Sequence, residues 1–257
     1  MAKAVSLIGL ESFPMVKLGD DIAALIVTTI KREELAIDDG DVVVIAHKVV
    51  SKAEGMVIRL RDVQPSKKTE EIAKVTLRDP RLVELILRET KNIVKATPEI
   101  LIVENKQSLV CVNAGVDKSN VEGDDAYVLL PKDPDESARR IRSEIKRLTG
   151  KKVGVIITDT YSRPFRRGQV EFAIGIAAIA AFRDYRGQKD LCGHVLKVKN
   201  TSVADEIASA AELIMGQGVE GVPVVIIKNL IGVVPKENVS SADLLISKDE
   251  DLFKNTL

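Results

Sequence analysis

The segment from residue 153 to 168 constrains the fold most, because an apolar run changes there abruptly into polar and charged residues. Residues 153–157 (VGVII) are β-branched and apolar apart from one glycine, as in a buried strand. Asp159 follows between two threonines, and Arg163, Arg166 and Arg167 come within eight residues of it. Carboxylate and hydroxyl oxygens beside guanidinium groups suit a metal-bound phosphate. We therefore expect a strand that ends near Ile157 and is followed by a reactive loop.

A purely structural interpretation of the same segment stays open. Asp159 would then cap a turn, and the arginines would form a solvated charged surface. Two other polar segments favour the functional interpretation, because each also borders an apolar run. They are residues 113–120 (NAGVDKSN) and 215–223 (MGQGVEGVP).

Charge and composition exclude some functions. The chain has 38 basic and 38 acidic residues, so no net field attracts nucleic acid or a membrane surface. Aromatic residues make up only 3%, which leaves no platform for base stacking. The longest apolar segment, Phe172 to Phe182, is far shorter than the roughly 20 residues of a membrane-spanning helix. We expect it to be core or subunit interface.

The two cysteines, Cys111 and Cys192, lie far apart beside apolar residues, without a CxxC motif or a signal peptide. We expect both to be buried free thiols in a cytoplasmic protein.

Apolar runs and capping residues alternate along the chain. Strands are expected over residues 5–8, 42–46, 100–103, 109–112, 153–157 and 222–227. Helices are expected over residues 22–30, 80–96, 134–149 and 203–215, the last after a capping box at Ser202 and Asp205. This order predicts an α/β to α+β fold with mixed sheets flanked by helices. We expect one unit over residues 1–257, built as two intertwined lobes.

Two further segments have the composition of anion sites. The strand at 42–46 leads directly into His47, Lys48, Ser51 and Lys52, and ligands gather at the carboxyl ends of strands in open α/β sheets. Each of these residues alone is common on ordinary surfaces. Near the end of the last helix, three glycines within residues 216–221 leave backbone N–H groups free to approach a ligand. Their spacing fits neither a P-loop nor GxGxxG.

Four blocks in this order resemble the coenzyme F420-0:L-glutamate ligases, or gamma-glutamyl ligases, essentially from end to end. The blocks are SKAEG at 51–55, NAGVDKSN at 113–120, TDT with RPFRRG at 158–168, and GQG at 216–218. Some bacterial members carry an additional C-terminal flavin-binding domain, for which 257 residues leave no room. The resemblance therefore implies the stand-alone form.

The resemblance implies a GTP-dependent enzyme that joins L-glutamate to coenzyme F420-0, then adds a gamma-linked glutamate to F420-1, and releases GDP and phosphate. It also implies a homodimer and divalent metal, Mn²⁺ or Mg²⁺, with K⁺ as a further candidate. The implied metal ligands are Asp117, Asp159, Thr160 and Gln217. The implied nucleotide contacts are Phe13, Pro14, Met15, Val16, His47, Lys48, Lys52, Asn120, Met215, Gly216, Gln217, Gly218, Val219, Glu220, Gly221 and Val222.

The chemistry of such a reaction agrees with these residue types. A carboxylate is a poor acyl donor, and phosphorylation to an acyl phosphate supplies a leaving group while cations neutralise the phosphate charge. Lys52, Arg163 and Arg166 are the candidate catalytic residues, since they could stabilise the transferring phosphoryl group or hold the acidic substrates. The sequence assigns no general base.

Two other functions are compatible with phosphate, metal and basic residues. One is a metal-dependent kinase or nucleotide hydrolase, and the other is a non-catalytic module that binds a nucleotide or a deazaflavin. Formation of an amide product distinguishes the ligase from both.

Overall fold

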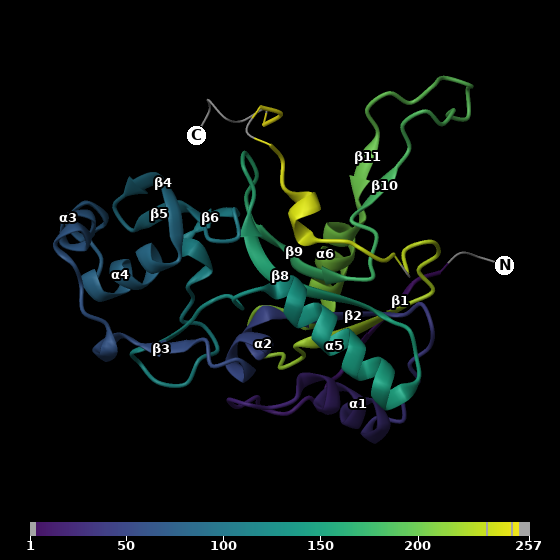
Figure 1. Ribbon diagram of the computed structural model, residues 1–257, viewed down its shortest axis with the longest axis horizontal. Coiled ribbons are helices and arrows are strands. Elements are labelled where there is room, and N and C mark those ends of the chain that lie inside the picture. The colour runs from purple at the N-terminus through teal and green to yellow at the C-terminus, as the bar shows by residue number, and fades with distance from the viewer. Residues whose placement is uncertain (1–3, 235, 248, 252–257) are drawn as a thin grey trace.

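The computed structural model describes residues 4–234, 236–247 and 249–251. Its centre is a five-stranded sheet in the order β1-β12-β2-β8-β9 (Figure 1). These strands are β1 (Ser6–Gly9), β12 (Val224–Lys228), β2 (Val42–Ala46), β8 (Gly154–Ser162) and β9 (Gln169–Ala177). Only β2 and β8 pair in parallel, and every other neighbouring pair in this sheet is antiparallel. The mixed sheet that the sequence predicts is confirmed.

Helices cover both faces of this sheet. On one face lie α1 (Ile22–Arg32), α2 (His47–Ala53) and α5 (Pro134–Thr149), and on the other lies α6 (Val203–Met215). Alternate residues of β2 enter the two cores: Val43 and Ile45 pack on the α1 and α5 side, and Val42 and Val44 pack on the α6 side. Because both faces are buried, a strand here is apolar throughout rather than alternating.

A second group of elements has a separate core and lies on the left in Figure 1. Its helices are η1 (Leu60–Asp62), α3 (Lys67–Thr76), α4 (Pro80–Arg88) and η2 (Asn113–Gly115). Its strands are β3 (Val57–Arg59), β4 (Thr90–Thr97), β5 (Ile100–Asn105), β6 (Val110–Val112) and β7 (Ala126–Val128). They form the sheets β4-β5-β6 and β3-β7. The fold is thus α+β, with several sheets flanked by helices.

The helix predicted over residues 80–96 is wrong in its second half. Helix α4 ends at Arg88, and β4 continues as an antiparallel partner of β5. Ile93 and Val94, in this second half, are 41% and 40% exposed. Their β-branched side chains suit a strand, and pairing with β5 decides the conformation.

The reactive loop predicted after Ile157 is also wrong, because β8 continues to Ser162. Thr158, Asp159 and Thr160 pair with β9 beyond a register shift at Ile157. The connecting loop contains only residues 163–168. Asp159 and Thr160 therefore lie on a hydrogen-bonded strand, which fixes the direction of each side chain.

The capping box predicted at the start of α6 is not formed. The Ser202 hydroxyl donates to the Asp205 carboxylate at 2.7 Å, and Asp205 accepts a hydrogen bond from the Ala173 N–H at 3.0 Å. Asp205 thereby ties the helix to β9. Of the cysteines, both are free, but Cys192 is exposed and Cys111 is only partly buried, so the prediction of two buried thiols is wrong.

The apolar segment from Phe172 to Phe182 is mostly internal core. It contains the second half of β9 and the following turn, and Ile174, Ile176 and Ile179 are at most 3% exposed. A Cβ at Gly175 would lie 2.5 Å from the Pro134 carbonyl, so glycine permits close contact between β9 and α5. No helix in the described ranges has the length and apolar character that a membrane crossing requires.

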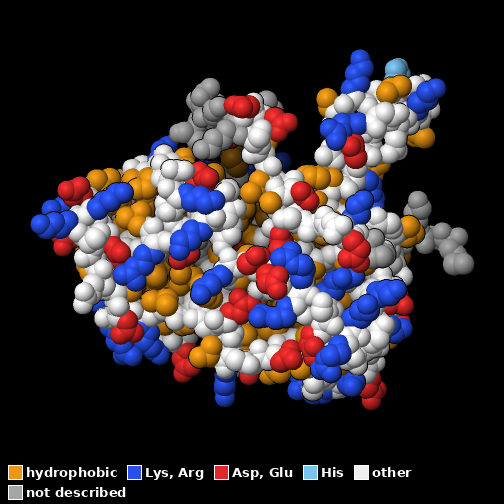
Figure 2. Space-filling view, viewed as in Figure 1, with side chains coloured by type: hydrophobic (Ala, Val, Ile, Leu, Met, Phe, Trp, Pro, Cys, Tyr) orange, Lys and Arg blue, Asp and Glu red, His pale blue; other side chains and the backbone are white. Residues whose placement is uncertain are grey.

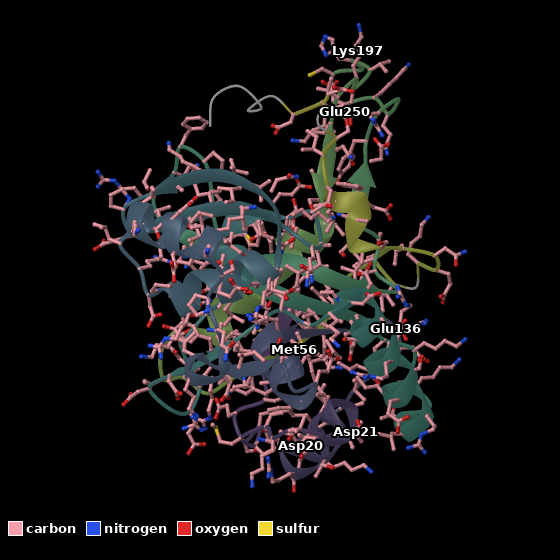
Figure 3. The ribbon with its side chains drawn as sticks, turned by 60° about the vertical axis from the view of Figure 1, so that its left-hand side comes forward. Asp20, Asp21, Met56, Glu136, Lys197 and Glu250 are labelled. Atoms are coloured by element: carbon pink, nitrogen blue, oxygen red, sulfur yellow. The ribbon has the colours of Figure 1, made fainter. Side chains whose placement is uncertain are left out.

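Beyond this segment, residues 182–202 form an arm that projects from the body (Figure 1). It begins and ends with the paired strands β10 (Phe182–Asp184) and β11 (Asn200–Ser202). Figure 3 shows Lys197 at the far end of this arm. Basic, acidic and hydrophobic side chains are intermixed over the face shown in Figure 2, in keeping with the balanced charge of the chain.

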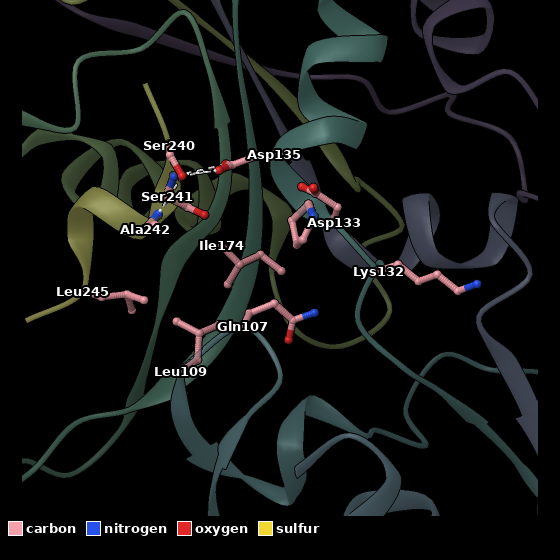
Figure 4. A pocket seen from close by; sticks show the side chains of 11 residues that line it. Gln107, Leu109, Lys132, Asp133, Asp135, Ile174, Ser240, Ser241, Ala242 and Leu245 are labelled. Atoms are coloured by element: carbon pink, nitrogen blue, oxygen red, sulfur yellow. Dashed lines mark hydrogen bonds between the residues drawn. The ribbon is translucent and has the colours of Figure 1, made fainter. Parts of the chain in front are cut away.

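Asp135 joins three elements at the start of α5. Its carboxylate accepts hydrogen bonds from Ile176 N–H at 2.7 Å and from the Ser240 hydroxyl at 2.7 Å, next to η3 (Ser241–Leu244) (Figure 4). Asp135 is 8% exposed, so loss of the carboxylate leaves a buried N–H without an acceptor. We expect Asp135→Ala to lower the free energy of unfolding by roughly 3 kcal/mol in chemical denaturation.

Glu136→Ala is the matched control, because it removes a carboxylate from the same helical turn at an exposed position (Figure 3). Its effect should stay within about 1 kcal/mol, since its ion pair with Arg139 is solvent-exposed. Equal destabilisation by the two substitutions would contradict the role given to Asp135.

Candidate functional site

The site begins where β2 ends, because α2 starts at the next residue. The parallel register places Ala46 opposite Thr158, so His47 emerges beside Asp159. His47 is 2% exposed, with its Nε2 3.3 Å from Asp159 Oδ1 and its Nδ1 3.2 Å from the Ser51 hydroxyl. The sequence predicts these residues at a strand end, but it does not predict the helix that carries them.

Lys48, the next residue of α2, contacts the second predicted aspartate. Its ammonium lies against the Asp117 carboxylate and the Ser119 hydroxyl, and Ser119 N–H donates to Asp117 Oδ1 at 3.0 Å. Burial raises the pKa of Asp117, but the hydrogen bonds from Lys48 and Ser119 outweigh burial and bring it down to about 2. Asp117 is therefore a carboxylate at neutral pH and is available as an oxygen ligand.

Lys52 lies one turn further along α2. Its ammonium donates to the Asn120 carbonyl at 2.7 Å, which joins the helix to the 113–120 segment. Burial, and then the nearby charge of Lys48, lower the pKa of Lys52. The structure thus brings His47, Lys48, Lys52, Asn120, Asp117 and Asp159 together around one short helix.

Thr160 and Gln217 meet on the other side of β8, together with Glu171, for which the sequence predicts no role. The Thr160 hydroxyl lies 2.8 Å from Glu171 Oε1 and 3.1 Å from Gln217 Oε1. The Gln217 amide N–H donates to the same Glu171 oxygen at 2.9 Å. Glu171 is 5% exposed. The only signal in the sequence is a single carboxylate, Glu171, at the edge of an apolar run. The sequence does not show that Glu171 pairs with Thr160 across neighbouring strands.

The four predicted metal ligands therefore fall into two groups. Neighbouring residues of an extended strand point to opposite faces, so Asp159 faces α2 while Thr160 faces the end of α6. Within the described ranges, no three His, Cys, Asp or Glu side chains gather as a complete metal cluster. Both groups consist of oxygen donors, which suit Mg²⁺ or Mn²⁺ when substrate phosphates and water supply the other ligands.

The predicted arginines lie on the loop between β8 and β9. Arg163 donates to the Arg167 carbonyl at 3.2 Å, and its buried Nε has no hydrogen-bond partner among the residues that the structure describes. Arg166 is exposed. Arg163 therefore helps to close the loop, whereas Arg166 extends from it towards solvent.

The glycine-rich loop after α6 already contacts a carboxylate. Gly216 ends the helix with φ of +63°, and Gly218 N–H donates to Glu220 Oε2 at 2.8 Å. A Cβ at Gly216 would meet the Glu220 carboxylate carbon at 2.2 Å. The loop thus holds the carboxylate of its own Glu220 beside its glycines, and its contact with a nucleotide stays a prediction. Met215 is buried, Val222 is partly buried, and Val219 and Gly221 are exposed.

The 13–16 segment is anchored in the core and presents its middle to solvent. Phe13 and Val16 are each 9% exposed, whereas Pro14 and Met15 are exposed. Gly19 N–H donates to the Ala53 carbonyl at 2.9 Å, which places this loop beside the C-terminal end of α2.

A hollow of about 240 Å³ lies elsewhere, beside Asp135 (Figure 4). Its lining includes Gln107, Leu109, Ile174 and Leu245, and none of the predicted site residues. The clustering of charged side chains around α2 and β8 therefore locates the candidate site, rather than this hollow.

Comparison with known proteins identifies the family of the chain. The family model for F420-0:gamma-glutamyl ligase matches residues 11–229. The chain is 46% identical over 255 residues to the coenzyme F420:L-glutamate ligase of Methanocaldococcus jannaschii, covering 98% of each chain. It is 44% identical over 253 residues to the ligase of that name from Archaeoglobus fulgidus, again covering 98% of each. The enzyme of that name from Methanothermobacter thermautotrophicus is 45% identical over 224 residues, covering 87% of this chain and 88% of the relative. The resemblance found in the sequence is confirmed, and the chain belongs to the F420-0:gamma-glutamyl ligase family.

Proposed function

We propose that this protein is a GTP- and divalent-metal-dependent ligase that joins L-glutamate to coenzyme F420-0 and then adds a gamma-linked glutamate to F420-1. The observation that carries the proposal is the contact of consecutive α2 residues with two carboxylates, His47 with Asp159 and Lys48 with Asp117. Family membership directs this charged cluster towards glutamate ligation, since the matched relatives carry the name of that reaction.

The chemistry proceeds in two steps. A carboxylate oxygen of F420-0 attacks the γ-phosphorus of GTP, so that an O–P bond forms and the bond to GDP breaks. The glutamate amine then attacks the acyl carbon, so that a C–N bond forms. The bond between the acyl carbon and the phosphate oxygen breaks, and phosphate leaves. The amine loses a proton in this second step. The product is an amide, together with GDP and phosphate.

Basic residues around α2 would bind the phosphates during the first step. In this proposal Lys52 lies at the nucleotide end of the cluster, and Arg163 and Arg166 act from the loop between β8 and β9. The exposed middle of the 13–16 segment, Asn120 and the glycine-rich loop would contact the nucleotide. Asp117 and Asp159 would hold Mn²⁺ or Mg²⁺ on one side of β8, with Thr160 and Gln217 on the other. Such a cation neutralises charge on phosphate oxygens during transfer.

The test is incubation with GTP, Mn²⁺, F420-0 and glutamate, followed by mass spectrometry. We expect a product heavier by one glutamyl residue, in parallel with GDP release. ATP in place of GTP, and Mg²⁺ in place of Mn²⁺, test the nucleotide and metal assignments in the same assay. GDP and phosphate release without the heavier product would instead indicate a nucleotide hydrolase.

Asp159→Asn should reduce the ligation rate by about a hundredfold or more, because removal of a charged metal ligand costs several kcal/mol of transition-state stabilisation. The substitution keeps the size of the side chain within β8, so the melting temperature should change little. Asp124→Asn, at an exposed position, is the control. Loss of folding in Asp159→Asn alone would favour a structural role for this carboxylate.

Gly218→Val should weaken GTP binding about tenfold, equivalent to roughly 1.4 kcal/mol, because the side chain crowds the approach of a phosphate to the loop. Gly218 does not have a positive φ, and the nearest atom to an added Cβ is in the Glu220 carboxylate at 3.3 Å, so a side chain fits when this exposed carboxylate shifts slightly. Isothermal titration with GTP measures the effect, and Leu213→Ala, at a position of α6 that is 79% exposed and outside the candidate site, is the control. Unchanged affinity in Gly218→Val would refute the anion-nest assignment.

We further propose that the protein assembles as a homodimer. The apolar segment from Phe172 to Phe182 is used mostly inside the chain, so it does not supply the dimer contact by itself. The projecting arm offers exposed apolar side chains, including Leu191 and Val198. Light scattering at micromolar concentration tests the assembly, and a monomer would overturn it.

A further inference from the structure

Glu171 is a buried carboxylate that contacts two residues of the candidate site, Thr160 and Gln217. One of its oxygens, Oε1, is shared by the Thr160 hydroxyl at 2.8 Å and the Gln217 amide at 2.9 Å. The other, Oε2, is buried and has no hydrogen-bond partner in the described part of the chain. Among the described residues, no Lys, Arg or His forms an ion pair with Glu171.

The group of Glu171, Thr160 and Gln217 has fewer hydrogen-bond donors than its oxygen acceptors require. The Thr160 hydroxyl has one proton, yet it lies within hydrogen-bond distance of two acceptors, Glu171 Oε1 and Gln217 Oε1. One of these oxygen–oxygen contacts therefore lacks a proton. Together with Glu171 Oε2, the group has at least two oxygen lone pairs that no donor satisfies. A buried carboxylate without a partner is costly, and a cation removes that cost.

The position of the group favours a cation that arrives with a phosphate. Gln217 belongs to the glycine-rich loop and is exposed, so the group opens to solvent on the side where Gly218 presents its N–H. Glu171, in contrast, is held by β9 directly opposite Thr160 of β8. One fixed carboxylate, a hydroxyl and an amide oxygen make an incomplete coordination shell of the kind that Mg²⁺ completes with phosphate oxygens and water.

We propose that Glu171 is a cation ligand. With Thr160 and Gln217 it forms a site for Mg²⁺ or Mn²⁺, which the diphosphate group of a bound nucleotide completes. The requirement for a diphosphate rests on the proposed function. The assignment of Glu171 rests on its unpartnered oxygen and on its contacts with the other two residues. Of these three protein ligands, only Glu171 is negatively charged. Asp117 and Asp159 lie on the other side of β8.

The test measures Mn²⁺ binding directly, without catalysis. Free Mn²⁺ is followed by electron paramagnetic resonance during titration of the full chain in the presence of saturating GDP. We expect Glu171→Gln to weaken one class of bound Mn²⁺ by tenfold or more, as loss of a ligand does at metal sites. Asp117→Asn should spare that class and weaken another. Glu206→Gln, at an exposed position on α6, is the charge-matched control and should bind as the unmodified protein does.

The outcomes separate this assignment from the proposed function. If the unmodified protein binds no Mn²⁺ with GDP, both the metal dependence and the Glu171 site are overturned. If it binds Mn²⁺ and Glu171→Gln binds equally well, only the Glu171 assignment is overturned, and the carboxylate serves to position Thr160 and Gln217. Should Glu171→Gln not fold, Glu171→Asp keeps the charge but retracts the oxygens by one methylene group. It is then expected to show the same tenfold weakening, and unchanged affinity would overturn the assignment.

Discussion

The parallel pairing of β2 with β8 is the constraint on which the rest of the site depends. Parallel strands end at the same edge of a sheet, so the start of α2 and the polar half of β8 must lie together. The register sets Ala46 opposite Thr158, and the next residues on each strand are His47 and Asp159. A shift of the register by one residue would turn Asp159 towards α6 and would separate it from His47.

The continuation of β8 through its polar residues has a second consequence. In a flexible loop, Asp159 and Thr160 could converge on one ion, but the alternation of an extended strand sends them to opposite faces. Pairing with β9 makes this separation rigid and brings Glu171 opposite Thr160. The sheet therefore divides the oxygen donors between the α2 side and the α6 side, and each side draws on a different segment of the chain for its remaining groups.

The sequence predicted elements well where burial leaves a single choice. The strand Val42–Ala46 has the predicted bounds because both of its faces are buried, and α5 has them because Asp133, Pro134 and Gly150 mark its ends. The prediction from sequence failed where one pattern suits two structures. Ile93 and Val94 fit the apolar side of a continued helix as well as they fit a strand. Helix α2 went unpredicted because it is short and Ala46 offers no capping side chain. Glu171 was missed because its role comes from cross-strand pairing, which no local pattern contains.

The two sides of the site also differ in how their charges are balanced before a substrate binds. Lys48 and Asp117 are partly exposed, so their pair contributes at most about 1 kcal/mol and can be exchanged for phosphate and cation at little cost. The exposed Glu220 carboxylate similarly occupies the glycine-rich loop through one hydrogen bond that a phosphate can replace. Glu171 is buried, and no basic residue in the described part of the chain pairs with it. Its negative charge is therefore not neutralised by the protein. Asp117 on the α2 side is therefore neutralised by an exchangeable contact, whereas Glu171 on the α6 side gains most from a cation.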